Sequence, residues 1–338
     1  MILESLWLAL LGVLLGGYFV LGGLDYGAQV LRLWLGGDES ARRSTLGALG
    51  PFFFGNEVWL VGFAGVLFGA FPFLEGKLLS GMYPLFLAIL IGLVVGKTAV
   101  QLRGRADTVR GRRVWDVLAF AGGLVPAWSW GMLVALLLRG VPIGADGHFT
   151  LTGAQLGEPF VLACGAASTA LFVTHGAAFL AARVRGAAAG AARALLPRLG
   201  VVTVVASLGA GGIGVASAVD DGFAAPAAAV AVGALLPIAV VAAMVASRRG
   251  WAKTAVTATG VAALVPALLP GVAHYPRLLV STVSERYSVT VSHAAADVET
   301  LKLLSAFGIV VVPVILLYQG WSWWAFRERV DSGSPTYF

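Results

Sequence analysis

The run L-S-G-M-Y-P-L-F-L-A-I-L-I-G-L-V-V-G-K-T-A-V-Q-L occupies residues 79–102 and contains one charged side chain, Lys97. About 20 apolar residues in a helix are enough to cross the hydrocarbon layer of a membrane. Arg103-Gly104-Arg105 follows the run directly, and basic residues at the end of an apolar run are typical of a cytoplasmic helix end. The sequence therefore predicts a membrane-spanning helix here.

Eight further runs have the same apolar character. The nine predicted spans cover approximately residues 6–31, 51–72, 79–102, 114–138, 159–182, 199–219, 226–246, 254–273 and 303–325. Only 12% of the residues are charged, against about 25% in a soluble chain, so lipid must cover much of the surface. Strands of a membrane barrel would be shorter and would alternate in polarity. We expect an all-α polytopic membrane protein that forms a single transmembrane domain over residues 1–338.

The two sets of span ends differ in their lysine and arginine content. One set holds 17 of these residues, the opposite set holds 5, and Lys97 lies within a span. Because basic loops remain in the cytoplasm, we expect the N-terminus outside and the C-terminus in the cytoplasm. The net charge of +6 is spread over short clusters between apolar runs, which argues against a nucleic-acid partner.

Among the ionisable residues inside predicted spans, four stand out, namely Asp25, Glu57, Lys97 and His175. Ionisable groups are costly inside a bilayer, so each suggests either a function or a structural ion pair. At 1.5 Å rise per residue, each lies about 9–12 Å from the cytoplasmic end of its span. We therefore expect all four in one layer of the membrane.

Two interpretations of this layer remain open. In the first, Lys97 neutralises Asp25 or Glu57 and holds three helices together. In the second, the carboxylates accept protons from the cytoplasm, and Asn56 and Gln101 extend the hydrogen-bonded path.

The histidines argue against a haem in this chain. A membrane haem is normally held by axial His or Met ligands, and of the four histidines only His175 lies within a predicted span. The chain also lacks the His and Cys spacing of a metal site. We therefore expect no cofactor, no catalytic residue and no metal ligand in this chain.

Several motifs resemble subunit II of the bacterial cytochrome bd-type quinol oxidases. The resemblance is carried by Gly55-Asn56-Glu57-Val58-Trp59-Leu60, Leu67-Phe68-Gly69-Ala70-Phe71-Pro72, Ser80-Gly81-Met82-Tyr83, Gly23-Leu24-Asp25-Tyr26-Gly27 and Tyr318-Gln319-Gly320-Trp321-Ser322-Trp323-Trp324. It extends over essentially the whole chain, and it places the protein in a bacterial cell membrane.

The resemblance implies two four-helix bundles plus one peripheral helix, in a heterodimer with a haem-bearing subunit I. Subunit I would carry haems b and d, oxidise quinol and reduce oxygen to water in the respiratory chain. This chain would support its assembly and, in some members, conduct protons. A small single-helix subunit and a quinone contact in this chain are left open.

This chain departs from the family pattern at several polar positions. The family usually has an acidic residue, attributed to proton uptake, where Phe54 stands, another acidic residue where Gly22 stands, and an Arg and a Glu where Gly96 and Gln101 stand. The loss of the acidic residues at positions 22 and 54 motivates an alternative function, a divergent relative that is a structural membrane partner or a transporter-like protein. An adjacent haem-bearing subunit would favour the oxidase.

Overall fold

The computed structural model describes residues 2–35, 39–50 and 52–331 of the 338-residue chain. The long helices are α1 (Ile2–Leu35), α3 (Glu57–Ala70), α5 (Tyr83–Leu102), α6 (Val109–Arg139), α8 (Pro159–Arg183), α9 (Gly186–Ala216), α10 (Pro226–Arg248), α11 (Ala252–His274) and α13 (Val298–Ala325). The shorter elements are α2 (Glu39–Leu49), α4 (Pro72–Gly81), α7 (Gly153–Leu156), α12 (Val291–Ala294) and the hairpin of β1 (Arg277–Leu279) and β2 (Val289–Thr290).

The fold is helical and multi-pass, as predicted. Within the described residues, eight helices are long and apolar enough to cross a membrane, and α3 with α4 forms a further pair that is bent by 118°. A count of nine spans therefore requires that the bent pair be taken as one span. Four spanning helices, α1, α6, α9 and α13, extend beyond the predicted runs by four or more residues at one or both ends, most of all α9, which begins at Gly186 rather than at 199.

The predicted boundaries around the second and third spans are wrong. Residues 52–56 form turns, so the helix begins only at Glu57, and residue 51 lies outside the described part. The helix breaks at Phe71, directly before Pro72. Proline has no N–H to donate within a helix, and it disfavours helical geometry in the residue before it. Residues 79–81 consequently belong to α4, and the third span begins at Tyr83.

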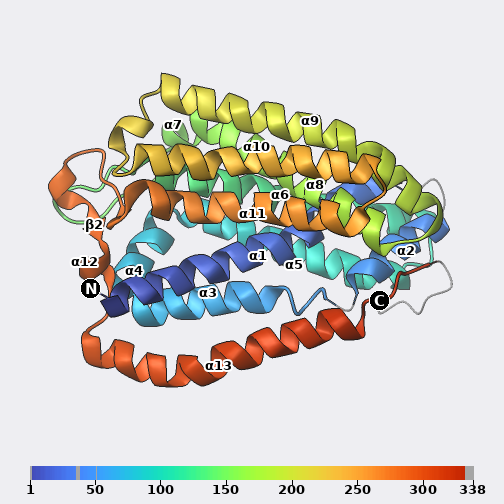
Figure 1. The fold of residues 1–338 in the computed structure, drawn as a ribbon, viewed down its shortest axis with the longest axis horizontal. Helices are drawn as coiled ribbons and strands as arrows, with labels where there is room; N and C mark the ends of the chain where they lie inside the picture. Colours follow the sequence, from blue (N-terminus) through green and yellow to red (C-terminus); the bar gives the residue numbers. More distant parts are fainter. Residues whose placement is uncertain (1, 36–38, 51, 332–338) are drawn as a thin grey trace.

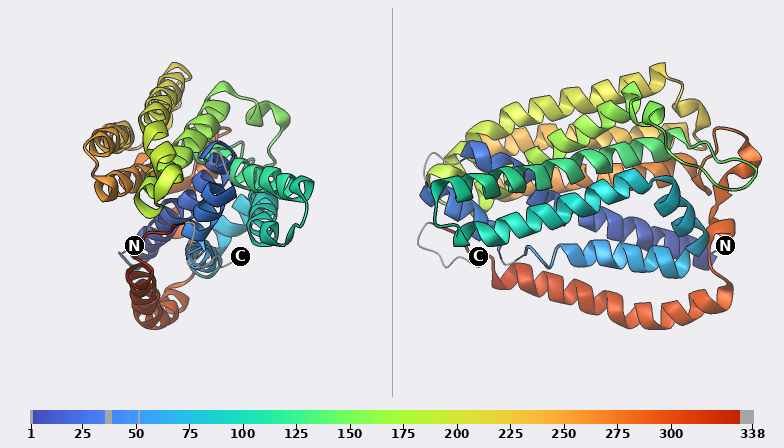
Figure 2. Two further views of the ribbon diagram at one scale, coloured as in Figure 1. Left: turned by 90° about the vertical axis from the view of Figure 1, so that its right-hand side faces the viewer. Right: turned by 180° about the vertical axis from the view of Figure 1, so that it is seen from behind.

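The spanning helices form two groups that pack along α1. One group contains α1, α3, α5 and α6, and the other contains α8, α9, α10 and α11; contacts of α1 with α8 and α11, and of α6 with α8, join them. Helix α13 lies outside both groups, beside α3 (Figures 1 and 2), and it contacts α3 and α1, and Phe179 of α8 through Trp323. This arrangement agrees with the two bundles and one peripheral helix implied by the resemblance.

Glycines allow the closest helix crossings. A Cβ atom added to Gly27 of α1 would lie 2.0 Å from the carbonyl oxygen of Phe172 in α8, and one added to Gly176 would lie 2.5 Å from the Gly27 carbonyl carbon. A Cβ on Gly122 of α6 would lie 2.2 Å from Cα of Gly96 in α5. Small residues of this kind let membrane helices pack backbone against backbone.

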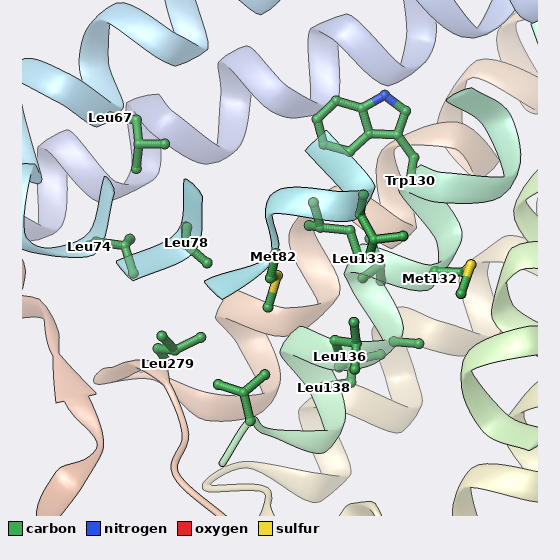
Figure 3. Close-up of a cluster of buried hydrophobic side chains, with 14 of the residues drawn as sticks. Leu67, Leu74, Leu78, Met82, Trp130, Met132, Leu133, Leu136, Leu138 and Leu279 are labelled. Atoms are coloured by element: carbon green, nitrogen blue, oxygen red, sulfur yellow. The ribbon is translucent and has the colours of Figure 1, made fainter. Parts of the chain in front are cut away.

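Buried apolar side chains fill the space between α3, α4, α6 and the hairpin at one end of the molecule. Figure 3 shows this cluster, in which Met82, Trp130, Leu133 and Leu136 are all buried and Leu279 reaches it from β1. The opposite end of the helices, on the right in Figure 1, holds α2 and most of the arginines. We call it the arginine-rich end.

Candidate functional site

Lys97 of α5 forms ion pairs with two carboxylates from two other helices. Its Nζ atom lies 2.9 Å from Oδ2 of Asp25 in α1 and 3.0 Å from Oε1 of Glu57 in α3. The same ammonium group donates a hydrogen bond to the carbonyl oxygen of Phe53 at 2.6 Å and lies 3.6 Å from the centre of the Phe53 ring. One cation thus connects α1, α3 and α5.

Asn56 completes this cluster from the turn that precedes α3. Its side-chain amide donates to both carboxylate oxygens of Asp25, at 3.3 Å each, and to the carbonyl oxygen of Leu21 at 3.1 Å. The Oδ1 atom of Asn56 is buried and has no hydrogen-bond partner among the described residues. A buried acceptor of this kind is a typical site for an ordered water.

The turn at residues 52–56 positions Asn56 and Glu57. The N–H of Asn56 donates to the carbonyl oxygen of Phe52 at 2.8 Å, and the N–H of Glu57 donates to that of Phe54 at 3.2 Å. Glu57 is the first residue of α3, where the helix dipole favours a negative charge.

We name Asp25, Asn56, Glu57 and Lys97 the Lys97 cluster. With every group ionised, one ammonium faces two carboxylates, so the cluster carries one net negative charge. Burying such a charge is costly, and a proton bound to either carboxylate would remove it. The exposed fraction rises from 2% for the Asp25 side chain to 23% for that of Glu57, so Glu57 is the member closest to the surface of the chain.

The other two predicted residues lie outside the Lys97 cluster. Gln101 is half-buried one turn after Lys97 on α5, and no hydrogen bond joins the two residues in the described part of the chain. His175 of α8 is buried; its Nδ1 lies 2.7 Å from the Thr259 hydroxyl and its Nε2 lies 2.8 Å from the carbonyl oxygen of Val20.

These contacts decide whether His175 fits a haem. Both ring nitrogens are hydrogen-bonded within the protein, so iron ligation would require one of these bonds to break and the packed helices to separate. The residues present do not fit an axial haem ligand at this position. In the ranges that the structure describes, no group of three His, Cys, Asp or Glu residues is placed to hold a metal ion.

The arginine-rich end contains a second buried ion cluster, which the sequence analysis missed. Asp116 of α6 accepts hydrogen bonds from Arg32 and Arg103, the latter at 2.6 Å, and lies 3.5 Å from Arg42. Arg103 also forms a two-pronged ion pair with Glu39 of α2, at 2.5 and 3.0 Å. Arg32, Arg103 and Asp116 are each less than 5% exposed. This Asp116 cluster joins α1, α2, α6 and the turn after α5.

A sequence signal for this cluster existed. Asp116 follows the arginine pair Arg112-Arg113 and is the only acidic residue in the predicted span 114–138. The predicted first span ends at residue 31, four residues before the end of α1, and so places Arg32 in a loop.

The contact with Arg103 changes the ionisation of Glu39. The hydrogen bonds from Arg103 lower the pKa of the Glu39 carboxyl below its usual value. Because the folded-state pKa is depressed, this contact stabilises the fold above the pKa of the unfolded chain. The contribution is lost as the pH falls through the folded-state value.

The chain matches one protein family over almost its entire length. The family model described as cytochrome bd terminal oxidase subunit II matches residues 3–326. A relative from Bacillus subtilis, described as cytochrome bd ubiquinol oxidase subunit 2, is 31% identical over 336 residues and covers 98% of both chains. The cytochrome bd-I ubiquinol oxidase subunit 2 of Escherichia coli K12 is 29% identical over 364 residues, which cover 97% of this chain and 95% of that protein.

A solved structure shares the fold. A chain of the bd oxidase from Geobacillus thermodenitrificans superimposes with a TM-score of 0.66 over 94% of this chain and 98% of that one, at 18% identity. The bundle of spanning helices with buried ion clusters thus defines a polytopic membrane subunit of this fold. The chain belongs to the cytochrome bd terminal oxidase subunit II family.

Proposed function

We propose that this protein is the haem-free subunit II of a cytochrome bd-type terminal oxidase in a bacterial cell membrane. In this complex, subunit I carries the haems, oxidises quinol and reduces oxygen to water. The observation that carries the proposal is the family match from residue 3 to 326. The occupied ring nitrogens of His175 support the absence of haem from this chain.

We infer that subunit I covers the side of the chain where Glu57 and Phe54 reach the surface. The Phe54 side chain is 59% exposed, and Glu57 beside it is partly exposed at membrane depth. A carboxylate that faced lipid would be costly, whereas a partner subunit can supply polar groups or water. This placement would bring the Lys97 cluster into contact with the partner subunit.

We further propose that the Lys97 cluster delivers protons toward subunit I. Phe54 and Gly22 stand where the family usually has acidic residues, so Glu57 and Asp25 are the carboxylates left to hold a proton. The unpartnered Oδ1 of Asn56 marks a place for a water that extends the path.

Glu57→Gln tests the two interpretations of this cluster. The amide keeps the shape of the side chain but cannot exchange a proton. If protons pass through Glu57, the complex assembles with its full haem content and its quinol-dependent oxygen consumption falls at least tenfold. The measurement is haem content and oxygen uptake on the same purified sample.

The ion-pair interpretation predicts a different result from the same variant. Neutralising Glu57 removes one of the two ion pairs of Lys97 and leaves the pair with Asp25, so the loss of stability is smaller than the about 3–5 kcal/mol that an orphaned buried charge costs. The yield of assembled complex then falls, while oxygen uptake per haem stays normal. Normal turnover in a normal complex contradicts both interpretations. Glu299→Gln is the matched control, because Glu299 is 81% exposed and pairs only with Lys302 in the described residues.

We propose that the arginine-rich end faces the cytoplasm, as the charge asymmetry predicts. In a chain whose Cys164 is replaced by alanine, Ala106→Cys should resist an impermeant thiol reagent in intact cells and react after lysis. Ala145→Cys, at the opposite end, should react in intact cells. Reversed labelling of the two positions would contradict the orientation.

A further inference from the structure

Five exposed basic side chains gather at the arginine-rich ends of α9, α10 and α11. They are Arg193, Arg198, Arg248, Arg249 and Lys253. From residue 186 to residue 284 the only acidic residues are Asp220 and Asp221, which lie between α9 and α10 at the opposite end of the helices. No carboxylate of the described residues pairs with any of the five. We call these five residues the basic rim.

The neighbouring arginines, in contrast to the basic rim, have hydrogen-bond or ion-pair partners among the described residues. Arg32 and Arg103 share the buried carboxylate of Asp116, and Arg183 donates to the carbonyl oxygen of Glu328. Those arginines have partners within the fold. Within the described residues, the positive charge of the basic rim therefore has no acidic partner.

Helix packing brings Arg198 and Arg248 to the same end of two neighbouring helices. A Cβ on Gly200 of α9 would lie 2.6 Å from Cγ of Met244 in α10, so the two antiparallel helices are in close contact near this end. Arg198 lies two residues before Gly200, and Arg248 follows Met244 by one turn. The rim therefore spans the α9–α10 contact.

A short turn with backbone hydrogen bonds connects α10 and α11. The N–H of Gly250 donates to Ser247 at 3.0 Å, and that of Trp251 donates to Ala246 at 2.8 Å. Gly250 has φ of +77°, a conformation that glycine adopts without strain. The Arg249 guanidinium lies 5.2 Å from the centre of the Trp251 ring. The turn thus holds Arg248, Arg249 and Lys253 close together.

Exposed apolar side chains lie directly beside the basic rim. Val201 and Val205 of α9 are 52% and 63% exposed, and Val241 and Val245 of α10 are 48% and 43% exposed. Trp251 is 54% exposed and stands at the helix end, where tryptophan typically meets the lipid headgroup layer. A ligand at this place therefore meets positive charge at the helix end and an apolar surface along the helices.

We propose that the basic rim is a binding site for an anionic phospholipid. The phosphate group lies among the guanidinium groups, which match its geometry, and the acyl chains lie along the valines of α9 and α10. Basic residues at the surface of an anionic membrane each strengthen binding by about fivefold. The site selects lipids by charge, because a zwitterionic headgroup gains little from five cations.

Fluorescence quenching of Trp251 tests this site in the assembled complex. The complex is reconstituted into phosphatidylcholine vesicles that contain a variable fraction of brominated phosphatidylglycerol or brominated phosphatidylcholine. The Trp251 signal is the difference between the unaltered complex and Trp251→Phe. We expect half-maximal quenching at a mole fraction at least fivefold lower for brominated phosphatidylglycerol, and a loss of this preference at 1 M salt.

Variants that leave Trp251 untouched assign the selectivity to the rim. Arg193→Gln with Arg248→Gln should abolish most of the preference for phosphatidylglycerol. Arg110→Gln with Arg113→Gln, two exposed arginines in the first turns of α6, should leave the preference intact. Equal quenching by both lipids overturns the proposal. So does an equal loss of preference in the two double variants, which would indicate only a general attraction to the cytoplasmic leaflet.

Discussion

Gly27→Ala is expected to prevent stable assembly of the chain. The added Cβ would lie 2.0 Å from the Phe172 carbonyl oxygen and within 3 Å of backbone atoms of Gly176. Backbone atoms cannot turn away as a side chain can, so α1 and α8 must separate. Overpacking typically costs about 1–3 kcal/mol and occasionally more, and we expect the upper end here. The measurement is the yield and thermal midpoint of monodisperse protein in detergent.

Gly212→Ala is the matched control for this prediction. Gly212 lies in α9, and a Cβ atom at this position would meet nothing within 4 Å. Alanine is also favoured over glycine within a helix by roughly 0.5–1 kcal/mol. The control should therefore keep or slightly raise the thermal midpoint. Equal losses in both variants would contradict the close crossing of α1 and α8.

Asp116→Asn is expected to have a comparably large effect at the arginine-rich end. The change removes the carboxylate that Arg32 and Arg103 share and leaves the buried Arg32 with no carboxylate partner in the described residues. Breaking a buried ion pair in this way typically costs about 3–5 kcal/mol. We expect a lower midpoint for unfolding and a reduced yield of the complex, measured by thermal denaturation in detergent.

Two further variants show whether buried charge causes this loss. Arg32→Gln combined with Asp116→Asn removes the unpaired cation and should recover part of the lost stability. Glu285→Gln breaks the pair with Arg277, in which the Glu285 side chain is 83% exposed, and should cost about 1 kcal/mol or less. If Asp116→Asn cost no more than Glu285→Gln, the Asp116 cluster would not hold the helices together.

The apolar runs predicted the spanning helices because a lipid environment constrains sequence strongly. A spanning helix must satisfy its own backbone hydrogen bonds and present apolar side chains, and both requirements are visible in a single run of residues. The division into a bent α3–α4 pair was not predicted, because hydropathy continues through Phe71 and Pro72 while the helix does not.

The Lys97 cluster could be predicted only in part. Depth along each helix placed Asp25, Glu57 and Lys97 in one layer, but depth does not say which helix faces which. The sequence left the partner of Lys97 open between two carboxylates, and the structure pairs it with both. Depth alone also grouped His175 with them, whereas helix rotation directs its ring toward Val20 and Thr259.

The Asp116 cluster was missed for a related reason. Counting the charges at the ends of apolar runs as loop residues predicts the orientation of the chain in the membrane. The same count ignores helices that continue past the apolar core. Helix α1 extends to Leu35, so Arg32 lies within the helix and points into the protein. Only the packing of α1 against α2 and α6 shows that its charge is buried.

The haem content of the purified protein tests the central claim most directly. The chain is purified through an affinity tag from membranes that contain its natural neighbours. We predict that it brings down a haem-bearing subunit with haems b and d and with quinol-dependent oxygen consumption. His175→Ala should leave the amount of haem unchanged, since we propose that this chain supplies no haem ligand. A tagged chain that purifies alone, without haem and without oxidase activity, would contradict the proposed function and favour a structural or transporter-like relative. A haem signal that disappears with His175→Ala would contradict the proposal that this chain is haem-free.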